Sequence, residues 1–186
     1  MEKKFELTDN FIINAFGVKL FQIKCTKSFK YAKEGDLGGY VEKDENLDQE
    51  SNAWVSGNAE VSGNARVSGD AEVSGYARVS GNARVYGNAR VFGNAWVSGN
   101  AQVSGDADIE NDNNHCGFDC FGSCNRHTHA YLTKDNKVEI TCGCFRGSIE
   151  EFEKKVEKTH SGKIYEKQYK AIINVIKIKF GLTDLI

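Results

Sequence analysis

The sequence predicts a mainly β protein built on a parallel β-helix with three six-residue repeats, or hexads, per coil. Valine or isoleucine recurs at every sixth residue from Val55 to Ile109. Alanine stands two positions before each of them, from Ala53 to Ala107, and glycine two positions after each valine, from Gly57 to Gly105. Proline is absent from the whole chain, which suits uninterrupted backbone hydrogen bonding. Such a fixed short period indicates a repeat architecture.

The six-residue period predicts how each hexad folds. On a strand, an alanine and a valine two positions apart share one face, and we expect that face to point inward. Glycine and asparagine tolerate left-handed backbone conformations and turn the corner. A helix is excluded because glycine recurs too often and six does not match a period of 3.6. A hairpin meander of four-residue strands has little core, so we expect three hexads to close a triangular coil.

Residues 1–50 are predicted to form an N-terminal β cap in front of the repeat, which spans residues 51–110. The apolar run 11–13 and the segment 18–23 indicate two antiparallel strands with a turn at 14–17. A glycine-rich corner is expected at 33–41. Val41 and Leu47 lie 12 and 6 residues before Ala53 and are expected to continue the inward register as a capping turn.

Residues 111–186 are predicted to form a small α+β module of the ββαα type, rich in cysteine and histidine. After a polar loop at 111–114, the segments 131–133 and 138–141 indicate a hairpin. Ser148 and Glu151 form a capping box, which predicts the start of a helix that ends near residue 160. A second helix is expected from Ile164 to Phe180, followed by Gly181 at its C-terminal end.

The overall composition limits the classes of partner. The chain has 186 residues and a net charge of −2, which disfavours bulk binding to nucleic acid or to an acidic membrane. No run of about 18 apolar residues occurs, so no membrane span is expected. Six cysteines without an N-terminal signal region favour a reducing, cytoplasmic setting over a disulfide scaffold.

One outward face of the predicted coil differs from the other two. Two faces alternate acidic and basic residues, or place arginine beside tryptophan, so ion-pair and cation–π ladders explain them. The third face stacks Arg66, Arg84 and Gln102 beside Tyr86 and has no acidic residue. We predict a binding site for an anion or nucleotide there. The alternative is a solvated face or one that a partner covers.

A cluster of cysteine and histidine provides the second candidate site. Thiolate and imidazole are the ligands that structural zinc prefers. The possible metal ligands are Cys116, Cys120, Cys124, Cys142 and Cys144, with His115, His127 and His129 nearby. The alternative is a set of small buried apolar cysteines with surface histidines. No other cofactor is expected.

The repeat pattern Val-x-Gly-Asn-Ala-x resembles the hexapeptide repeat of left-handed parallel β-helices. The glycine-rich segment 33–47 and the segments 141–152 and 159–160, which contain Cys-Gly-Cys-Phe and Thr-His, resemble hexapeptide-repeat proteins of bacteriophages and prophages. Cys116, Cys120 and Cys124 depart from that pattern. The resemblance implies a left-handed coil and a phage accessory or anti-defence protein in the cytoplasm of an infected bacterium.

We therefore expect a non-enzymatic binding protein that sequesters or blocks a host immune component, either a defence protein or a nucleotide-type signal. The alternative is a hexapeptide-repeat acyltransferase that uses acetyl-CoA. Such enzymes usually carry a catalytic histidine on a loop between coils, whereas all four histidines of this chain follow the repeat. Flat-sided coils associate readily, so a homo-oligomer, a trimer or a dimer, is expected.

Overall fold

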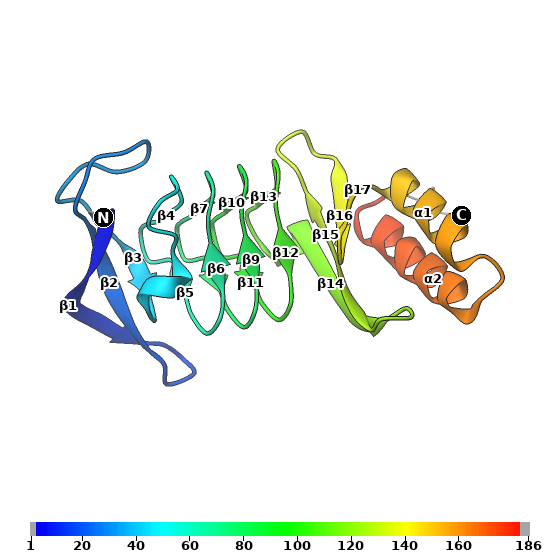
Figure 1. Cartoon of the computed structure of the whole chain (residues 1–186), viewed down its shortest axis with the longest axis horizontal. Coiled ribbons are helices and arrows are strands. Elements are labelled where there is room, and N and C mark those ends of the chain that lie inside the picture. Colours follow the sequence, from blue (N-terminus) through cyan, green and yellow to red (C-terminus); the bar gives the residue numbers. More distant parts are fainter. Residues whose placement is uncertain (1–2, 183–186) are drawn as a thin grey trace. The chain divides into compact units, whose positions relative to one another are not determined.

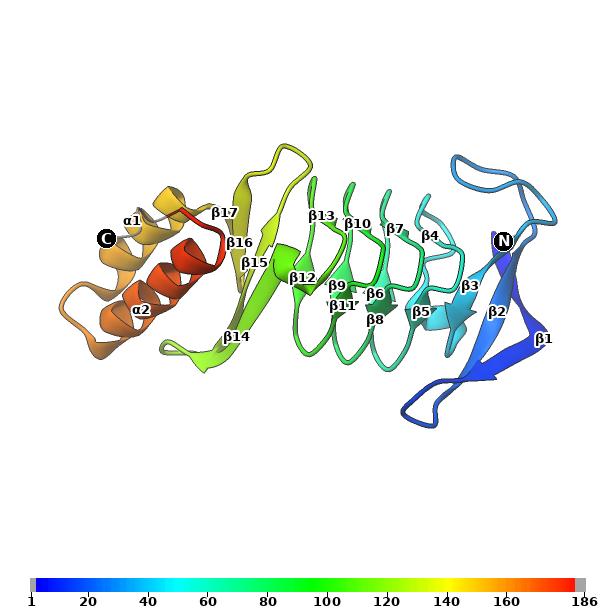
Figure 2. The same ribbon diagram turned by 180° about the vertical axis from the view of Figure 1, so that it is seen from behind.

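The computed structural model describes residues 3–182, and the chain divides into two compact units, Met1–Asp112 and Asn113–Ile186. The first unit holds the predicted N-terminal cap together with the whole repeat (Figures 1 and 2). The second unit holds the predicted cysteine-rich module. Within the described residues, no helix is long and apolar enough to cross a membrane.

The repeat forms a β-solenoid of about four turns. Each hexad supplies one short strand, and strands 18 residues apart pair in parallel, so that Val61 pairs with Val79 and Val79 with Val97. The strands are two residues long rather than the expected four, although backbone hydrogen bonds continue past them. They are β4 (Trp54–Val55), β5 (Glu60–Val61), β6 (Arg66–Val67), β7 (Glu72–Val73), β8 (Arg78–Val79), β9 (Arg84–Val85), β10 (Arg90–Val91), β11 (Trp96–Val97), β12 (Gln102–Val103) and β13 (Asp108–Ile109).

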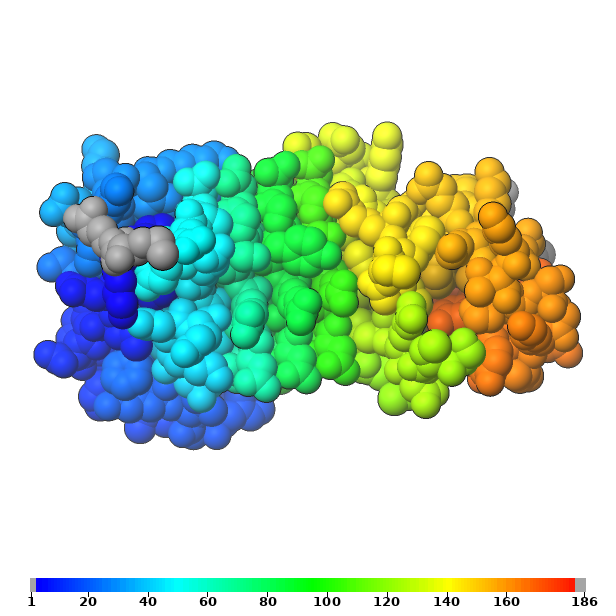
Figure 3. All heavy atoms as spheres, in the orientation of Figure 1, coloured from blue at the N-terminus to red at the C-terminus, as the bar shows by residue number. Residues whose placement is uncertain are grey.

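The inward positions are occupied as the period predicts. Every alanine and valine of the hexads is buried, and these small side chains fill the narrow interior of the solenoid. The corners stack as well: the side-chain amide of Asn64 donates to Asn82, and that of Asn82 donates to Asn100, each over 3.2 Å. Figure 3 shows the outward side chains of the repeat packed into one continuous surface.

The N-terminal cap is continuous with one sheet of the solenoid. Strand β1 (Phe5–Ile13) pairs with β2 (Lys19–Cys25), and β3 (Leu37–Val41) pairs antiparallel with β2 and parallel with β5. The expected glycine corner at 33–41 is therefore partly strand. Glycine is needed at position 38 because a Cβ atom there would lie 2.6 Å from the carbonyl oxygen of Val55.

The capping turn is confirmed, with a different register. Val41 and Leu47 are buried, and they pair with Val61 and Val67, whereas the sequence suggested alignment with the alanines. These pairs are two residues further apart than the pairs of the repeat. The two extra residues lie between Leu47 and Val55, where the carbonyl oxygens of Asp48 and Ser51 accept hydrogen bonds from the ammonium group of Lys4.

The C-terminal unit has four strands rather than the two expected. The antiparallel order is β14 (His115–Phe121), β15 (Arg126–Leu132), β16 (Val138–Cys142) and β17 (Phe145–Ser148). The strands β14 and β17 were not predicted from the sequence, because the cysteine and histidine residues of β14 suggested a metal cluster. In β14, Cys116 and Phe118 in fact alternate with polar residues and pack against the core.

Two helices complete this unit, close to the predicted bounds. Helix α1 (Ile149–His160) begins with the predicted capping box, in which the Ser148 hydroxyl accepts a hydrogen bond from the Glu151 amide. Helix α2 (Ile164–Lys179) ends before Gly181, which has a φ of 66°. Both helices pack on the sheet face that carries Ala130, Ile140 and Cys142.

Candidate functional site

The four ligand-binding residues predicted from the repeat lie together on the sheet β6–β9–β12. Arg66 pairs with Arg84, and Arg84 pairs with Gln102. Their neighbouring valines point inward, so these polar side chains point outward. Together with Tyr86 and Ser68 they line a depression of about 330 Å³. We call these five residues the arginine face.

The arginine face differs electrostatically from the other outward faces. Arg78 lies 3.8 Å from Glu60, and Arg90 lies 3.2 Å from Asp108 and stacks over Phe92. Among the residues that the structure describes, neither Arg66 nor Arg84 forms an ion pair. Two like charges directly opposite each other repel, and an anion placed between them would relieve that repulsion.

Acidic residues border this face at one end. A neighbouring depression of about 510 Å³ is lined by Arg66 and Ser68 together with four carboxylates of the cap, namely Asp44, Glu45, Asp48 and Glu50. The expectation that Arg66 has no acidic neighbour therefore holds only for the repeat itself. Negative charge at this border disfavours long polyanions and favours a small ligand.

The aromatic residues of the repeat have different environments. Tyr86 is 37% exposed, so part of its side chain is accessible to a ligand. Trp96 is also exposed and contacts Phe16 of the β1–β2 turn. Trp54 occupies an outward position, paired with Glu72, but it is buried because Phe29 of the cap packs against it, with ring centroids 5.4 Å apart.

The five cysteines proposed as metal ligands are divided among different environments. Cys116 packs against the helical core, and burial raises the pKa of its thiol to about 11. Cys120 is exposed and has a φ of 64°. Cys142 is buried and accepts a hydrogen bond from the Thr128 hydroxyl over 3.3 Å. Cys124 and Cys144 are exposed.

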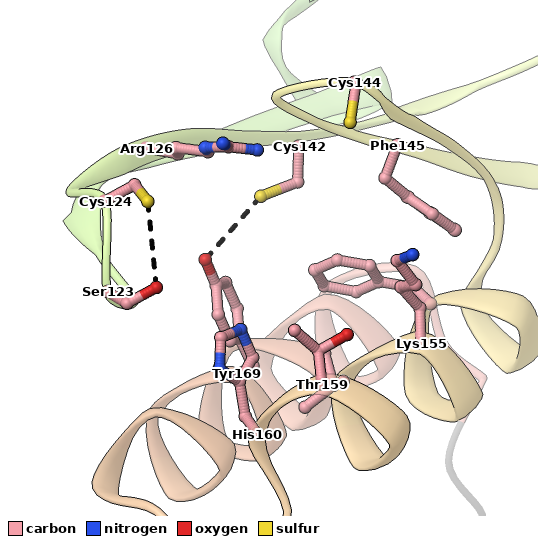
Figure 4. Close-up of a pocket in the computed structure, with 12 residues that line it drawn as sticks. Ser123, Cys124, Arg126, Cys142, Cys144, Phe145, Lys155, Thr159, His160 and Tyr169 are labelled. Carbon is pink, nitrogen blue, oxygen red and sulfur yellow. Dashed lines mark hydrogen bonds between the residues drawn. The ribbon is translucent and has the colours of Figure 1, made fainter.

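This distribution does not assemble the predicted zinc site. Between residues 3 and 182, no three side chains of histidine, cysteine, aspartate or glutamate form a group that could hold a metal ion. A thiol with a pKa near 11 stays protonated at neutral pH, whereas a metal binds the thiolate. Figure 4 shows the guanidinium of Arg126 lying among Cys124, Cys142 and Cys144.

Three of the module's histidines, His115, His127 and His129, lie on the sheet face opposite the helices. His127 and His129 alternate with Thr128 and Ala130, which face the core side. His127 Nδ1 lies 2.7 Å from a carboxylate oxygen of Asp119, and His115 Nδ1 lies 3.0 Å from His129 Nε2. These contacts orient the imidazole rings. Among residues 3–182, these histidines do not combine with the thiols of Cys124, Cys142 and Cys144 into a group that could hold a metal ion.

The C-terminal unit contains a pocket that the sequence interpretation missed. It has a volume of about 230 Å³ and is lined by side chains of the β14–β15 turn, the β16–β17 turn and both helices (Figure 4). Its polar residues include Arg126, Lys155, Thr159 and His160. One feature of the sequence pointed to this pocket. The face of α1 that carries Val156 continues, three residues later, with the polar Thr159, so a polar side chain follows the apolar stripe on the same face.

Comparisons with known proteins concern the repeat alone. Residues 59–75, 77–91 and 83–99 match the family described as YdcK beta solenoid repeat. A comparison with curated proteins found no match. The segments on which the resemblance to phage proteins rests, 33–47, 141–152 and 159–160, lie outside the matched ranges, so that resemblance stays a prediction. The chain thus contains a β-solenoid whose repeats are similar to those of the YdcK family.

Proposed function

We propose that this protein is a non-enzymatic binding protein that takes a small anionic ligand of the nucleotide type on its arginine face. The observation that carries the proposal is the paired Arg66 and Arg84, which share a depression with Tyr86 and Gln102. Within residues 3–182, no carboxylate forms an ion pair with either arginine. The resemblance to phage proteins suggests the setting, an infected bacterial cytoplasm. There the protein would sequester a host immune signal or block a defence protein.

The residue types suit the parts of a nucleotide. A guanidinium donates two parallel hydrogen bonds to a phosphate, and two stacked guanidinium groups match a diester or a pair of phosphates. The exposed ring of Tyr86 offers a stacking surface for a base. Gln102 carries both donors and acceptors for base edges. A volume of about 330 Å³ lies at the lower end of small-molecule pockets.

We also propose that the solenoid is left-handed with three hexads per coil. Pairing between strands 18 residues apart supports three hexads. The handedness rests on the resemblance to hexapeptide repeats. A crystal structure would test both, and a right-handed coil would contradict the proposal.

Calorimetry with a panel of cyclic and linear nucleotides tests the ligand proposal. We expect one member to bind, and Arg84→Gln to weaken binding about tenfold, because a charge-assisted hydrogen bond is lost. Arg78→Gln is the matched control, since Arg78 is also exposed but lies beside Glu60 on another face. If no nucleotide of the panel binds at high concentration, the nucleotide proposal is contradicted.

The acyltransferase alternative makes a different prediction with the same protein. If the solenoid is an acetyl-CoA enzyme, acetyl-CoA should raise the melting temperature of the protein. We expect no shift. A shift that persists in Arg84→Gln would favour the enzyme over the binding protein.

Self-association and a protein target form the last part of the proposal. Exposed apolar side chains gather around the β1–β2 turn, where Phe16 contacts Trp96 and Ile13 is also exposed. Such patches commonly mark protein contacts. We expect a dimer or trimer by light scattering, and Phe16→Ser to shift it toward the monomer. A pull-down from bacterial lysate, with mass spectrometry of proteins and small molecules, would separate a protein target from a nucleotide signal.

A further inference from the structure

We propose that the C-terminal unit carries a second, independent binding site: a pocket for a small organic anion, a carboxylate or phosphate with an apolar end, bounded by Arg126, Lys155 and His160. The pocket lies wholly within residues 123–169 and shares no residue with the arginine face. Its volume of about 230 Å³ is below the usual range for drug-sized ligands, so the ligand must be small.

The turn between β14 and β15 is fixed against helix α2, and this contact builds one wall. The amide of Gly122 donates a hydrogen bond to Gln168 over 3.1 Å. Gly122 has a φ of 72°, and a Cβ atom at this position would overlap the hydroxyl of Tyr169. Glycine thus allows the turn to approach the helix, and the turn brings Arg126 to the rim of the pocket.

The floor of the pocket is an ordered set of buried groups. Tyr169 is 5% exposed, and its hydroxyl lies 3.7 Å from Cys142 Sγ. The ring of His160 stacks on that of Tyr169 with centroids 5.5 Å apart. Phe145 and Phe152, with centroids 5.0 Å apart, form an apolar wall. These packed contacts hold the lining in place before any ligand arrives.

The charges around this pocket all have the same sign. Arg126 and Lys155 line it, and no aspartate or glutamate does. In the described part of the chain, neither cation forms an ion pair with a carboxylate. The thiols of Cys124 and Cys144 interact with the guanidinium group of Arg126.

Two cations beside an aromatic wall select a particular chemistry. The planar guanidinium binds a carboxylate or phosphate through paired hydrogen bonds, while the ammonium supplies a point charge. The wall of Phe145 and Phe152 offers apolar contact to the remainder of the ligand. Metal binding is a poor alternative, because the Arg126 cation lies among the thiols that would have to hold the ion.

The pocket can be tested with three probes: phenyl phosphate, benzoate and inorganic phosphate. Binding of each to the whole protein is measured by NMR chemical-shift titration. We expect phenyl phosphate and benzoate to perturb the backbone amides around Gly122 and Tyr169. Inorganic phosphate should bind more weakly, because it lacks the apolar part. If inorganic phosphate binds as tightly as phenyl phosphate, the apolar wall is not part of the site and the proposal is overturned.

Two variants and one matched control identify the residues. Lys155→Gln and Arg126→Gln should each weaken phenyl phosphate about tenfold. Lys154→Gln removes a neighbouring charge on the same helix that does not line the pocket, and it should leave binding unchanged. If Lys154→Gln and Lys155→Gln weaken phenyl phosphate binding equally, the ligand is attracted by the overall positive charge of the helix, and the proposed site is refuted. Arg84→Gln should not affect this binding, so the pocket can be tested apart from the arginine face.

Discussion

Arg66 lies directly opposite Arg84 on adjacent parallel strands, so two guanidinium groups emerge from neighbouring turns of the solenoid on the same face. At the equivalent position of another face, Glu60 lies opposite Arg78. The same backbone geometry thus supports a pair of opposite charges in one place and a pair of like charges in another. The like pair is a cost to stability that ligand binding can offset.

Replacing Arg84 with glutamate should separate stability from binding. Arg84→Glu creates a pair with Arg66 that matches the pair of Glu60 with Arg78. We expect the free energy of unfolding in urea to rise by up to about 1 kcal/mol, because repulsion becomes attraction at an exposed site. Anion binding to the arginine face should be lost. A variant that is less stable than Arg84→Gln would contradict this account of the face.

The glycine corners of the solenoid should resist substitution for two separable reasons. Gly87 has a φ of 72°, and a Cβ atom there would lie 2.9 Å from the backbone nitrogen of Gly105. Gly17 has a φ of 77° but open space around it. Gly17→Ala should therefore cost about 1–2 kcal/mol from backbone strain alone. Gly87→Ala should cost about 1–2 kcal/mol more, because adjacent turns must also move apart.

Chemical denaturation of both variants measures this difference. If Gly17→Ala and Gly87→Ala destabilise equally, the stacking of corners contributes nothing and only the positive φ requires glycine.

The interior of the solenoid is predictable from the sequence because a strand follows one simple rule. Residues two apart share a face, so a period of six identifies Ala and Val as inward positions without any tertiary information. The same rule places Arg66, Arg84 and Gln102 outward, and three hexads per coil bring them to one face. Pairing 18 residues apart then follows from the number of hexads that closes a coil.

The pocket of the C-terminal unit could not be predicted in the same way. Its walls come from segments that meet only through tertiary contacts, such as Gly122 with Gln168, which are 46 residues apart. In addition, the cysteines of β14 suggested metal binding, although Cys116 and Phe118 alternate along the strand and pack against the core. Local patterns therefore revealed the solenoid face but not the pocket between the sheet and the helices.

Lys4 should be a specific requirement for the joint between cap and solenoid. It is 6% exposed, and its ammonium donates hydrogen bonds to the carbonyl oxygens of Asp48, Ser51 and Ala53 over 2.6, 2.7 and 2.8 Å. Lys4→Met would leave these acceptors without their donor, at a cost of about 2–4 kcal/mol in the free energy of unfolding.

The adjacent residue provides the control. Lys3 is exposed and pairs with Asp44 at the surface, so Lys3→Met should leave the free energy of unfolding nearly unchanged. Urea denaturation of the two variants in parallel gives the comparison. If both variants lose the same free energy of unfolding, the positive charge near the N-terminus contributes more than the three hydrogen bonds from Lys4 to carbonyl oxygens.

The buried thiol of Cys116 should make stability depend on alkaline pH. Burial raises its pKa from 9.0 to about 11, so the folded protein holds this proton more tightly than the unfolded chain does. As the pH rises from about 9 to 11, the unfolded chain loses the proton first, and stability present below pH 9 declines. The loss should be about 1–2 kcal/mol, since the thiol is only partly buried.

Cys116→Val removes the titrating group and keeps an apolar side chain in the core. The difference in unfolding free energy between wild type and this variant should therefore narrow or reverse in favour of the variant as the pH rises from 9 to 11. Alkylation with iodoacetamide at pH 8 gives a second readout, in which Cys116 should react more slowly than the exposed Cys124 and Cys144. A difference in stability that does not change with pH, together with equal alkylation rates, would show that Cys116 is not held protonated by the core.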